Sequence, residues 1–176
     1  DVRILGYSAV APYNVETAKR AIKTLEDFKG LQLKAIPIFM DPLKQMGAVG
    51  SVVPMVDTYV SLQKNIIDGL MGPTEVLKSF KLAEIVKHVT YLYIYTGHRA
   101  RYLMNSSSWK RLPPDIQKIF ERNIDFITTQ CDIESLKTEE EAMKYARELG
   151  VQFYQLPPQD LKRFYDLMDS AVLKLS

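Results

Sequence analysis

Short strand-like segments alternate with helical segments along almost the whole chain, and this alternation constrains the fold more than any other feature. Period-two patterns and short apolar runs predict strands at residues 2–8, 31–36, 51–55, 70–71, 91–95, 100–105 and 151–156. Capping residues and apolar spacing predict helices at residues 24–30, 41–47, 56–67, 73–86, 106–111, 113–149 and 159–175. Residues 9–22, which include Pro12, are expected to form a loop. The predicted class is therefore α/β with a largely parallel or mixed sheet.

The longest predicted helix follows Leu112 and two prolines. Its apolar side chains recur every three or four residues and form one stripe, made of Ile116, Phe120, Ile124, Ile127 and Cys131. About 35 residues at 1.5 Å each would give a rod about 50 Å long. A kink or a break near Thr138 is therefore an open alternative to one continuous helix.

The composition excludes several classes of protein. Lys and Arg total 23 and Asp and Glu total 21, so the net charge is +2, without a basic block that would indicate nucleic-acid binding. The single cysteine, Cys131, excludes an intrachain disulfide and a multi-cysteine metal site. No apolar run reaches the roughly 18 residues that a membrane-spanning helix needs.

The sequence carries no recognisable motif of an enzyme active site. It has neither a phosphate-binding glycine motif nor a nucleophile elbow. No group of residues supplies a nucleophile with its base, or a metal shell. We therefore predict no enzymatic activity and no cofactor. The run of three glutamates that begins at Glu139 is expected to lie on a solvated helix face.

Two groups of side chains near residue 95 are candidates for a ligand site. Tyr91, Tyr93 and Tyr95 alternate along a predicted strand, so their rings point to one side, either into a core or along the wall of an apolar pocket. His98 and Arg99 follow that strand and could hold an anion at its end, although solvated side chains are the simpler interpretation. The local sequence does not decide between core and pocket wall for the tyrosines, or between anion binding and solvation for His98 and Arg99.

Three stretches, taken together, resemble one protein family. They are residues 22–34 (IKTLEDFKGLQLK), 53–69 (VPMVDTYVSLQKNIIDG) and 109–120 (WKRLPPDIQKIF). In order and spacing they resemble the periplasmic solute-binding subunits of tripartite ATP-independent periplasmic (TRAP) transporters, of the dicarboxylate-binding type. The resemblance implies a two-lobed, type II-like periplasmic binding protein. Such a protein closes on a small organic acid and delivers it to a membrane permease, without a cofactor or a chemical reaction.

The resemblance also implies which residues bind the ligand. The family usually has an arginine where this sequence has Lys34 and an asparagine where it has Gly72, and a second arginine is replaced near Asn14. Lysine keeps the positive charge but loses the planar two-point contact with a carboxylate. The ligand is therefore either an organic acid or a less charged molecule in a tyrosine-lined pocket. The residues predicted to bind it are Lys34, Gly72, Tyr93, Tyr95, His98 and Arg99.

Relative to the family, the sequence starts late. We expect residues 1–176 to be the C-terminal part of an exported, periplasmic solute-binding protein. This part comprises the second lobe, the strands that cross between the lobes and the long helix that spans both, without a secretion signal or most of the first lobe. The surface left by the missing lobe suggests a homodimer. The replaced arginine and asparagine keep one alternative open, a ligand-independent interaction or sensor module derived from the same fold.

Overall fold

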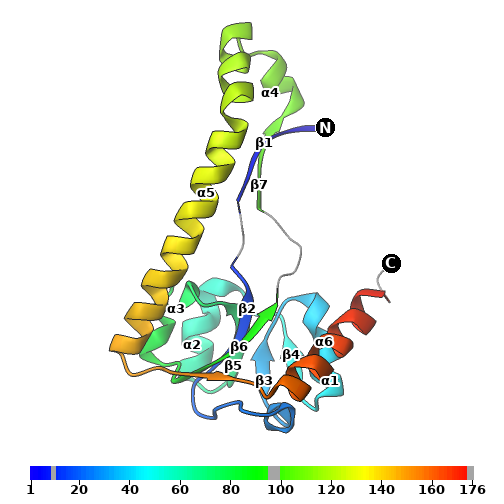
Figure 1. Ribbon diagram of the computed structural model, residues 1–176, viewed down its shortest axis with the longest axis vertical. Helices are drawn as coiled ribbons and strands as arrows, with labels where there is room; N and C mark the ends of the chain where they lie inside the picture. The colour runs from blue at the N-terminus through cyan, green and yellow to red at the C-terminus, as the bar shows by residue number, and fades with distance from the viewer. Residues whose placement is uncertain (9–10, 95–99, 174–176) are drawn as a thin grey trace.

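The computed structural model describes residues 1–8, 11–94 and 100–173 of the chain (Figure 1). The strands are β1 (Val2–Ser8), β2 (Tyr13–Thr17), β3 (Gln32–Lys34), β4 (Val49–Ser51), β5 (Gly69–Pro73), β6 (His88–Ile94), β7 (Ala100–Asn105) and β8 (Gln152–Gln155). The α-helices are α1 (Met40–Gln45), α2 (Thr58–Gln63), α3 (Val76–Ser79), α4 (Ser106–Lys110), α5 (Pro114–Glu148) and α6 (Pro158–Leu173). Short 3-10 turns lie at Leu25–Phe28, Pro37–Phe39, Met55–Asp57 and Leu82–Glu84.

Two sheets organise the described strands. Six strands form a mixed sheet in the order β4-β3-β5-β2-β6-β8, and β1 pairs with β7 in a separate antiparallel ribbon. Within the larger sheet, β2 runs antiparallel to both of its neighbours, whereas the other five strands share one direction. The prediction of an α/β class with a mixed sheet is therefore confirmed.

The central strand β2 lies in the segment that the sequence pattern predicts to be a loop, so that prediction is wrong for Tyr13–Thr17. The strand carries Asn14 and Glu16, polar residues that are uncommon in the middle of a sheet. Pairing with β5 on one side and with β6 on the other satisfies its backbone groups. The tertiary pairing therefore overrides the local sequence pattern.

Helices cover both faces of the larger sheet. On one face, α1, α6 and the turn at residues 25–28 enclose a core that includes the fully buried Phe28, Leu33 and Phe164. On the other face, α2, α3 and the C-terminal half of α5 enclose a second core that includes the fully buried Leu70 and Val89. Burying one such side chain contributes about 1.5–3 kcal/mol, so packing on both sides fixes the sheet firmly.

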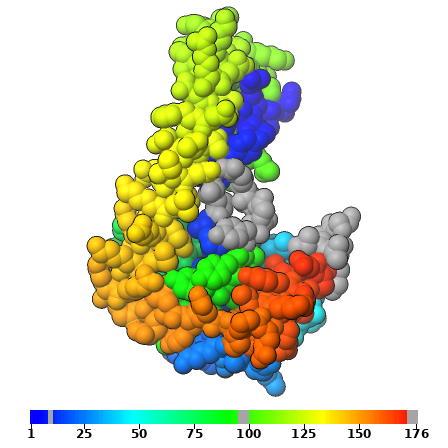
Figure 2. Space-filling view, in the orientation of Figure 1, coloured from blue at the N-terminus to red at the C-terminus, as the bar shows by residue number. Residues whose placement is uncertain are grey.

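The long helix α5 is continuous over its 35 residues, without a break near Thr138. The Thr138 hydroxyl donates a hydrogen bond to the Glu134 carbonyl oxygen at 2.7 Å, within the helix itself. The N-terminal half of α5 packs against β1, and its C-terminal half lies on the larger sheet, where Ala142 and Ala146 are fully buried. The helix thus joins the narrow upper part of the molecule to its broad lower part (Figure 2).

The apolar stripe predicted for α5 is half-buried, and it contacts the ribbon of β1 and β7. Cys131 lies 3.3 Å from the Tyr102 hydroxyl of β7, and the backbone N–H of Tyr7 donates to the Thr128 hydroxyl at 3.2 Å. Elsewhere on α5, four apolar side chains are exposed, namely Ile119, Phe126, Ile133 and Leu136. Within the described residues, no helix is both long and apolar enough to cross a membrane.

The helix predicted at residues 73–86 is much shorter in the structure. Pro73 ends β5, and only Val76–Ser79 form an α-helix before Lys81 adopts a left-handed conformation with φ of +56°. A right-handed helix cannot continue through that conformation. A separate 3-10 turn at Leu82–Glu84 follows instead.

Candidate functional site

Five strands of the larger sheet end at the same edge, which we call the upper edge because it faces the β1–β7 ribbon in Figure 1. Lys34 ends β3, Ser51 ends β4 and Pro73 ends β5. Strands β6 and β8 also end there, and β2 begins there. Ligands of open α/β sheets bind in the crevice outside the carboxyl ends of the strands. The upper edge is therefore the candidate site.

Lys34 is a half-buried cation at this edge. Burial lowers the pKa of its ammonium group, and the charge of Glu16 acts in the opposite direction. Within the part of the chain that the structure describes, Lys34 Nζ has no ion pair and no hydrogen bond. A partly desolvated cation without a fixed partner is suited to bind an anion, because such a group is stabilised when it becomes paired.

One row of paired residues crosses the sheet at Lys34. The register places Ser51 beside Lys34, Lys34 beside Leu70, and Leu70 beside Glu16. Residues that pair directly across neighbouring strands point to the same face of a sheet. The side chains of Lys34 and Glu16 therefore flank Leu70 on one face. We call the three polar residues on this line, Ser51, Lys34 and Glu16, the polar row.

Two members of the polar row are buried without a protein partner. The Ser51 hydroxyl and both carboxylate oxygens of Glu16 are inaccessible to solvent and form no hydrogen bond with the described residues. Burial raises the pKa of Glu16 well above its ordinary value of 4.5. The charges of Glu139 and Glu75 raise this pKa further, while Lys34 lowers it. Burial and the two acidic neighbours therefore act against ionisation of Glu16.

Gly72 is buried near the upper edge, and an added Cβ atom would make only ordinary van der Waals contacts there. A Cβ atom at this position would have only Leu70 Cδ1 at 3.4 Å and Val76 Cγ2 at 4.0 Å as close neighbours. By contrast, a Cβ atom at Gly69 would overlap the backbone oxygen of Glu16. The backbone therefore requires glycine at Gly69 but not at Gly72.

Asn14 holds the end of β6 through two hydrogen bonds and links it to the turn after β5. Its Oδ1 accepts from the backbone N–H groups of Leu92 at 3.0 Å and Tyr93 at 3.3 Å, and its Nδ2 donates to the Thr74 hydroxyl at 3.1 Å. Tyr93 has φ of +51°, a left-handed conformation that is a genuine outlier for a bulky residue. The amide of Asn14 is therefore occupied in fixing this strained end of β6.

The ring of Tyr93 lies at the surface of the upper edge, with 41% of the residue exposed. It stacks on Tyr91 with 5.2 Å between the ring centroids and 6° between the ring planes. Gln155 Nε2 donates to its hydroxyl at 3.3 Å, and Tyr91 packs in turn on Phe153 at 5.7 Å. The prediction that Tyr91 and Tyr93 point to one side is confirmed.

Of the residues predicted to bind a ligand, the structure places Lys34, Gly72 and Tyr93 at the upper edge. Lys34 and Tyr93 are three strand positions apart, about 14 Å across the sheet at the usual strand spacing, and Tyr93 also lies further along its strand than the residue level with Lys34. The other three predicted residues lie outside the described residues, namely Tyr95, His98 and Arg99.

Glu139 contacts the turn after β5, which the sequence pattern does not predict. It is half-buried rather than solvated, and its Oε2 accepts the backbone N–H of Glu75 at 2.9 Å. Burial raises the pKa of its carboxyl, and hydrogen bonds from Thr74 and Glu75 oppose that rise. Glu139 therefore attaches α5 to the turn between β5 and α3, next to the candidate site.

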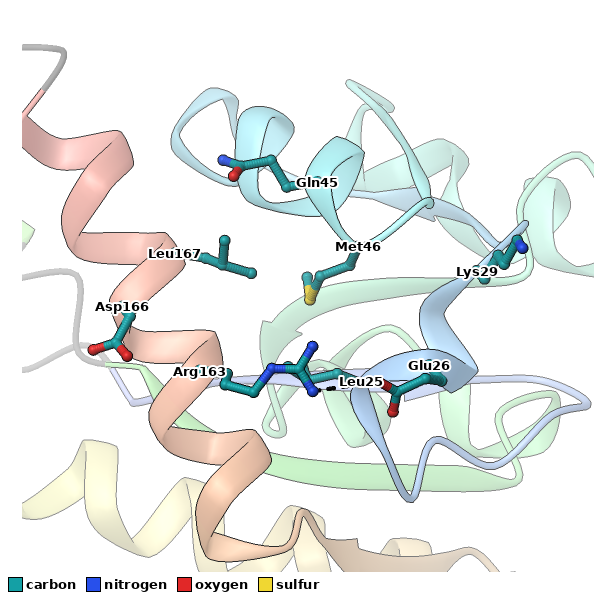
Figure 3. A pocket seen from close by; sticks show the side chains of 8 residues that line it. All are labelled: Leu25, Glu26, Lys29, Gln45, Met46, Arg163, Asp166 and Leu167. Carbon is teal, nitrogen blue, oxygen red and sulfur yellow. Dashed lines mark hydrogen bonds and ion pairs between the residues drawn. The ribbon is translucent and has the colours of Figure 1, made fainter.

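A separate pocket of about 480 Å³ opens on the opposite face of the sheet (Figure 3). It lies between α1, α6 and the turn at residues 25–28, and Arg163 forms an ion pair with Glu26 at 3.3 Å along its wall. None of the predicted binding residues that the structure places lines this pocket. Among the described residues, no group of acidic, histidine or cysteine side chains is arranged to hold a metal ion.

Comparison with known proteins gives consistent matches. The profile of the bacterial extracellular solute-binding proteins, family 7, matches residues 1–176. A solute-binding protein of Verminephrobacter eiseniae is 30% identical over 112 residues, which are 61% of this chain and 32% of that protein. The chain therefore spans about one third of the length of this curated relative.

Solved structures of TRAP periplasmic solute-binding proteins share the fold. One from Sulfitobacter sp. NAS-14.1, with bound β-D-galacturonate, superposes with a TM-score of 0.86 at 19% identity. The match covers 98% of this chain and 57% of the Sulfitobacter chain. Another, from Desulfovibrio salexigens with bound orotic acid, superposes with a TM-score of 0.85 at 22% identity. That match covers 97% of this chain and 55% of the Desulfovibrio chain. At these identities the likeness establishes the fold alone.

Proposed function

Because the chain belongs to family 7 of the bacterial extracellular solute-binding proteins, we propose that it captures a small organic acid at the upper edge of its larger sheet. The observation that carries this proposal is Lys34, a half-buried cation that no described carboxylate pairs. Lys34 lies where ligands of open α/β sheets bind. The carboxylate of the solute is the partner that the ammonium group lacks within the described residues.

The surroundings of Lys34 suit an acid held by one point of contact. A lysine ammonium group binds a carboxylate as a compact charge, without the two parallel hydrogen bonds of an arginine. Charge-assisted hydrogen bonds of this kind contribute about 1.5–3 kcal/mol. Gly72 adds no side chain beside the contact, and the exposed ring of Tyr93 offers an apolar surface at the same edge. The three residues together suit a small solute with one acidic group and an apolar or ring-shaped body.

The whole binding site extends beyond residues 1–176 in this proposal. The chain covers 57% of the Sulfitobacter protein and 32% of the Verminephrobacter protein. We place residues 1–176 as the C-terminal part, with the second lobe, the crossing strands and the lobe-spanning α5. The first lobe would close over the upper edge and favour the closed state, because only then does the solute contact both lobes. Delivery to a TRAP permease in the periplasm completes the proposed role.

The alternative of a ligand-independent interaction module is not favoured. That hypothesis rests on the replaced arginine and asparagine. It would fit an upper edge that had no positive charge to bind an acid. Lys34 keeps such a charge, and Gly72 adds no side chain that would obstruct a ligand. A homodimer through the surface left by the missing lobe stays a prediction.

A thermal-shift screen of the intact protein tests the proposal. The panel contains carboxylates of different shapes, such as D-galacturonate, orotate, mandelate and succinate, each with an uncharged analogue. A solute at 100 times its Kd stabilises the folded state by about 2.7 kcal/mol, which raises the melting temperature by several degrees. We expect at least one carboxylate to do so while its uncharged analogue does not. No response to any carboxylate would contradict the proposed function.

A further inference from the structure

Glu16 is the buried titratable group that solute capture, as described above, leaves unused. It is fully buried in the central strand β2, and neither carboxylate oxygen has a hydrogen-bond partner among the described residues. Buried polar groups in folded proteins are nearly always hydrogen-bonded, so an unpaired carboxyl group in a sheet core needs an explanation. A neutral apolar residue would fill the same place without this disadvantage.

The position of Glu16 relative to Lys34 supplies an explanation. Both residues pair with Leu70, one from each side, and both side chains point to the same face. Two strand spacings separate their backbones by about 10 Å, a distance that one lysine and one glutamate side chain can span together. Nevertheless, the structure shows no ion pair between them. The ammonium group and the carboxyl group are therefore neighbours that remain unpaired.

We propose that Glu16 is a positioning residue that acts through Lys34, which in turn rests on the proposed role of Lys34 in solute binding. While Glu16 is uncharged, the ammonium group of Lys34 stays available to the carboxylate of the solute. Once Glu16 ionises, its carboxylate competes for the same ammonium group. Solute affinity then falls.

The groups that surround Glu16 determine when it ionises. Glu75, which precedes α3, and Glu139 of α5 are the acidic groups that face it, and Lys34 of β3 is the cation. Burial and the two acidic neighbours favour the uncharged form, whereas Lys34 favours the ionised form. A bound solute carboxylate neutralises Lys34 and so removes the one charge that favours ionisation. Solute binding and protonation of Glu16 should therefore support each other.

The first experiment measures solute affinity against pH in the intact protein. Isothermal titration with the carboxylate that responds best in the thermal-shift panel is carried out from pH 5 to pH 7.5, which limits loss of charge from Lys34 itself, for the native protein, Glu16→Gln and Glu140→Gln. Glutamine has the size of glutamate without its charge, and Glu140 is an exposed residue of α5 that serves as the matched control. We expect the native protein and the control to lose affinity about tenfold as pH rises, the size of one charge interaction near a protein surface. Glu16→Gln should keep its affinity across the range. The same decline in all three proteins would overturn the role of Glu16 without affecting the proposed function.

The second experiment needs no solute, so it separates failure of this inference from failure of the proposed function. Lysine side chains are labelled with 13C-methyl groups, and the Lys34 signal is identified by its loss in Lys34→Arg. We expect the Lys34 signal to show an additional inflection with pH, caused by ionisation of Glu16, and we expect that inflection to disappear in Glu16→Gln. A Lys34 signal that titrates identically in both proteins would overturn the inference.

Discussion

The side-chain oxygen of Asn14 accepts a hydrogen bond of 3.3 Å from the backbone N–H of Tyr93, the residue at which β6 adopts φ of +51°. Backbone strain of this kind is about 1–3 kcal/mol per residue and persists only where surrounding contacts hold it. The same oxygen also accepts from Leu92, so one buried side chain replaces the strand partner that β6 lacks at this irregular position.

Replacing Asn14 should therefore destabilise the fold. Asn14→Ala leaves buried backbone N–H groups unpaired, and we expect a loss of about 2–4 kcal/mol in the free energy of unfolding. Chemical denaturation measures this value. Asn123→Ala removes a side chain that contacts only its own helix at Ile119, so it should change stability by less than about 0.5 kcal/mol. Equal effects of the two substitutions would contradict the role given to Asn14.

Glu16 should make stability fall as pH rises. Its pKa in the folded state lies above the ordinary 4.5 of the unfolded chain. Above pH 4.5 the unfolded state therefore loses its proton first, and proton release favours unfolding until the folded carboxyl ionises too. Glu16→Gln should be more stable than the native protein at pH 8, and the two should converge near pH 4. Denaturation midpoints across this range test the prediction, and a native protein that gains stability relative to Glu16→Gln as pH rises would contradict it.

Two glycines of β5 should respond very differently to an added side chain. Gly69→Ala forces a Cβ atom against the backbone of Glu16, and we expect a loss of about 2–4 kcal/mol in the free energy of unfolding. Gly72→Ala meets only side-chain atoms at 3.4 Å or more and should change it by less than about 1 kcal/mol. Thermal denaturation of the two variants side by side checks the difference. A large loss in Gly72→Ala would contradict the ordinary contact distances found at this position.

The continuity of α5 is testable at Thr138, the position where the sequence leaves a break open. Thr138→Pro removes a helical hydrogen bond and introduces a clash, so we expect a loss of about 3 kcal/mol or more. Thr138→Ala keeps the helix and serves as the control. If the proline variant were as stable as the alanine variant, α5 would be interrupted there in solution.

The sequence pattern predicts much of the fold but not its central strand. Strand β1 and the long α5 follow from clear apolar patterns and capping signals. Strand β2 does not, because Asn14 and Glu16 interrupt its pattern and only its pairing with β5 and β6 makes it a strand. The short α3 is also missed, since the left-handed turn at Lys81 has no signal in an otherwise helical pattern.

The site is predicted only in part for the same reason. Lys34, Gly72 and Tyr93 could be found because they occupy recognisable positions in a family pattern or an aromatic strand. Glu16 could not, because its importance comes from register, which places it across Leu70 from Lys34. Once β2 is recognised as a central strand, a glutamate within it is unusual, and this would have indicated the importance of Glu16.

The most direct test of the account is the affinity of the intact protein for a carboxylate with and without Lys34. Isothermal titration at pH 6 compares the native protein with Lys34→Ala, Lys34→Arg and the exposed control Lys64→Ala. Loss of one charge-assisted hydrogen bond of about 1.5–3 kcal/mol corresponds to roughly 10- to 150-fold weaker binding. We predict that loss for Lys34→Ala, binding retained in Lys34→Arg and no change in Lys64→Ala. Unchanged affinity in Lys34→Ala would contradict the account.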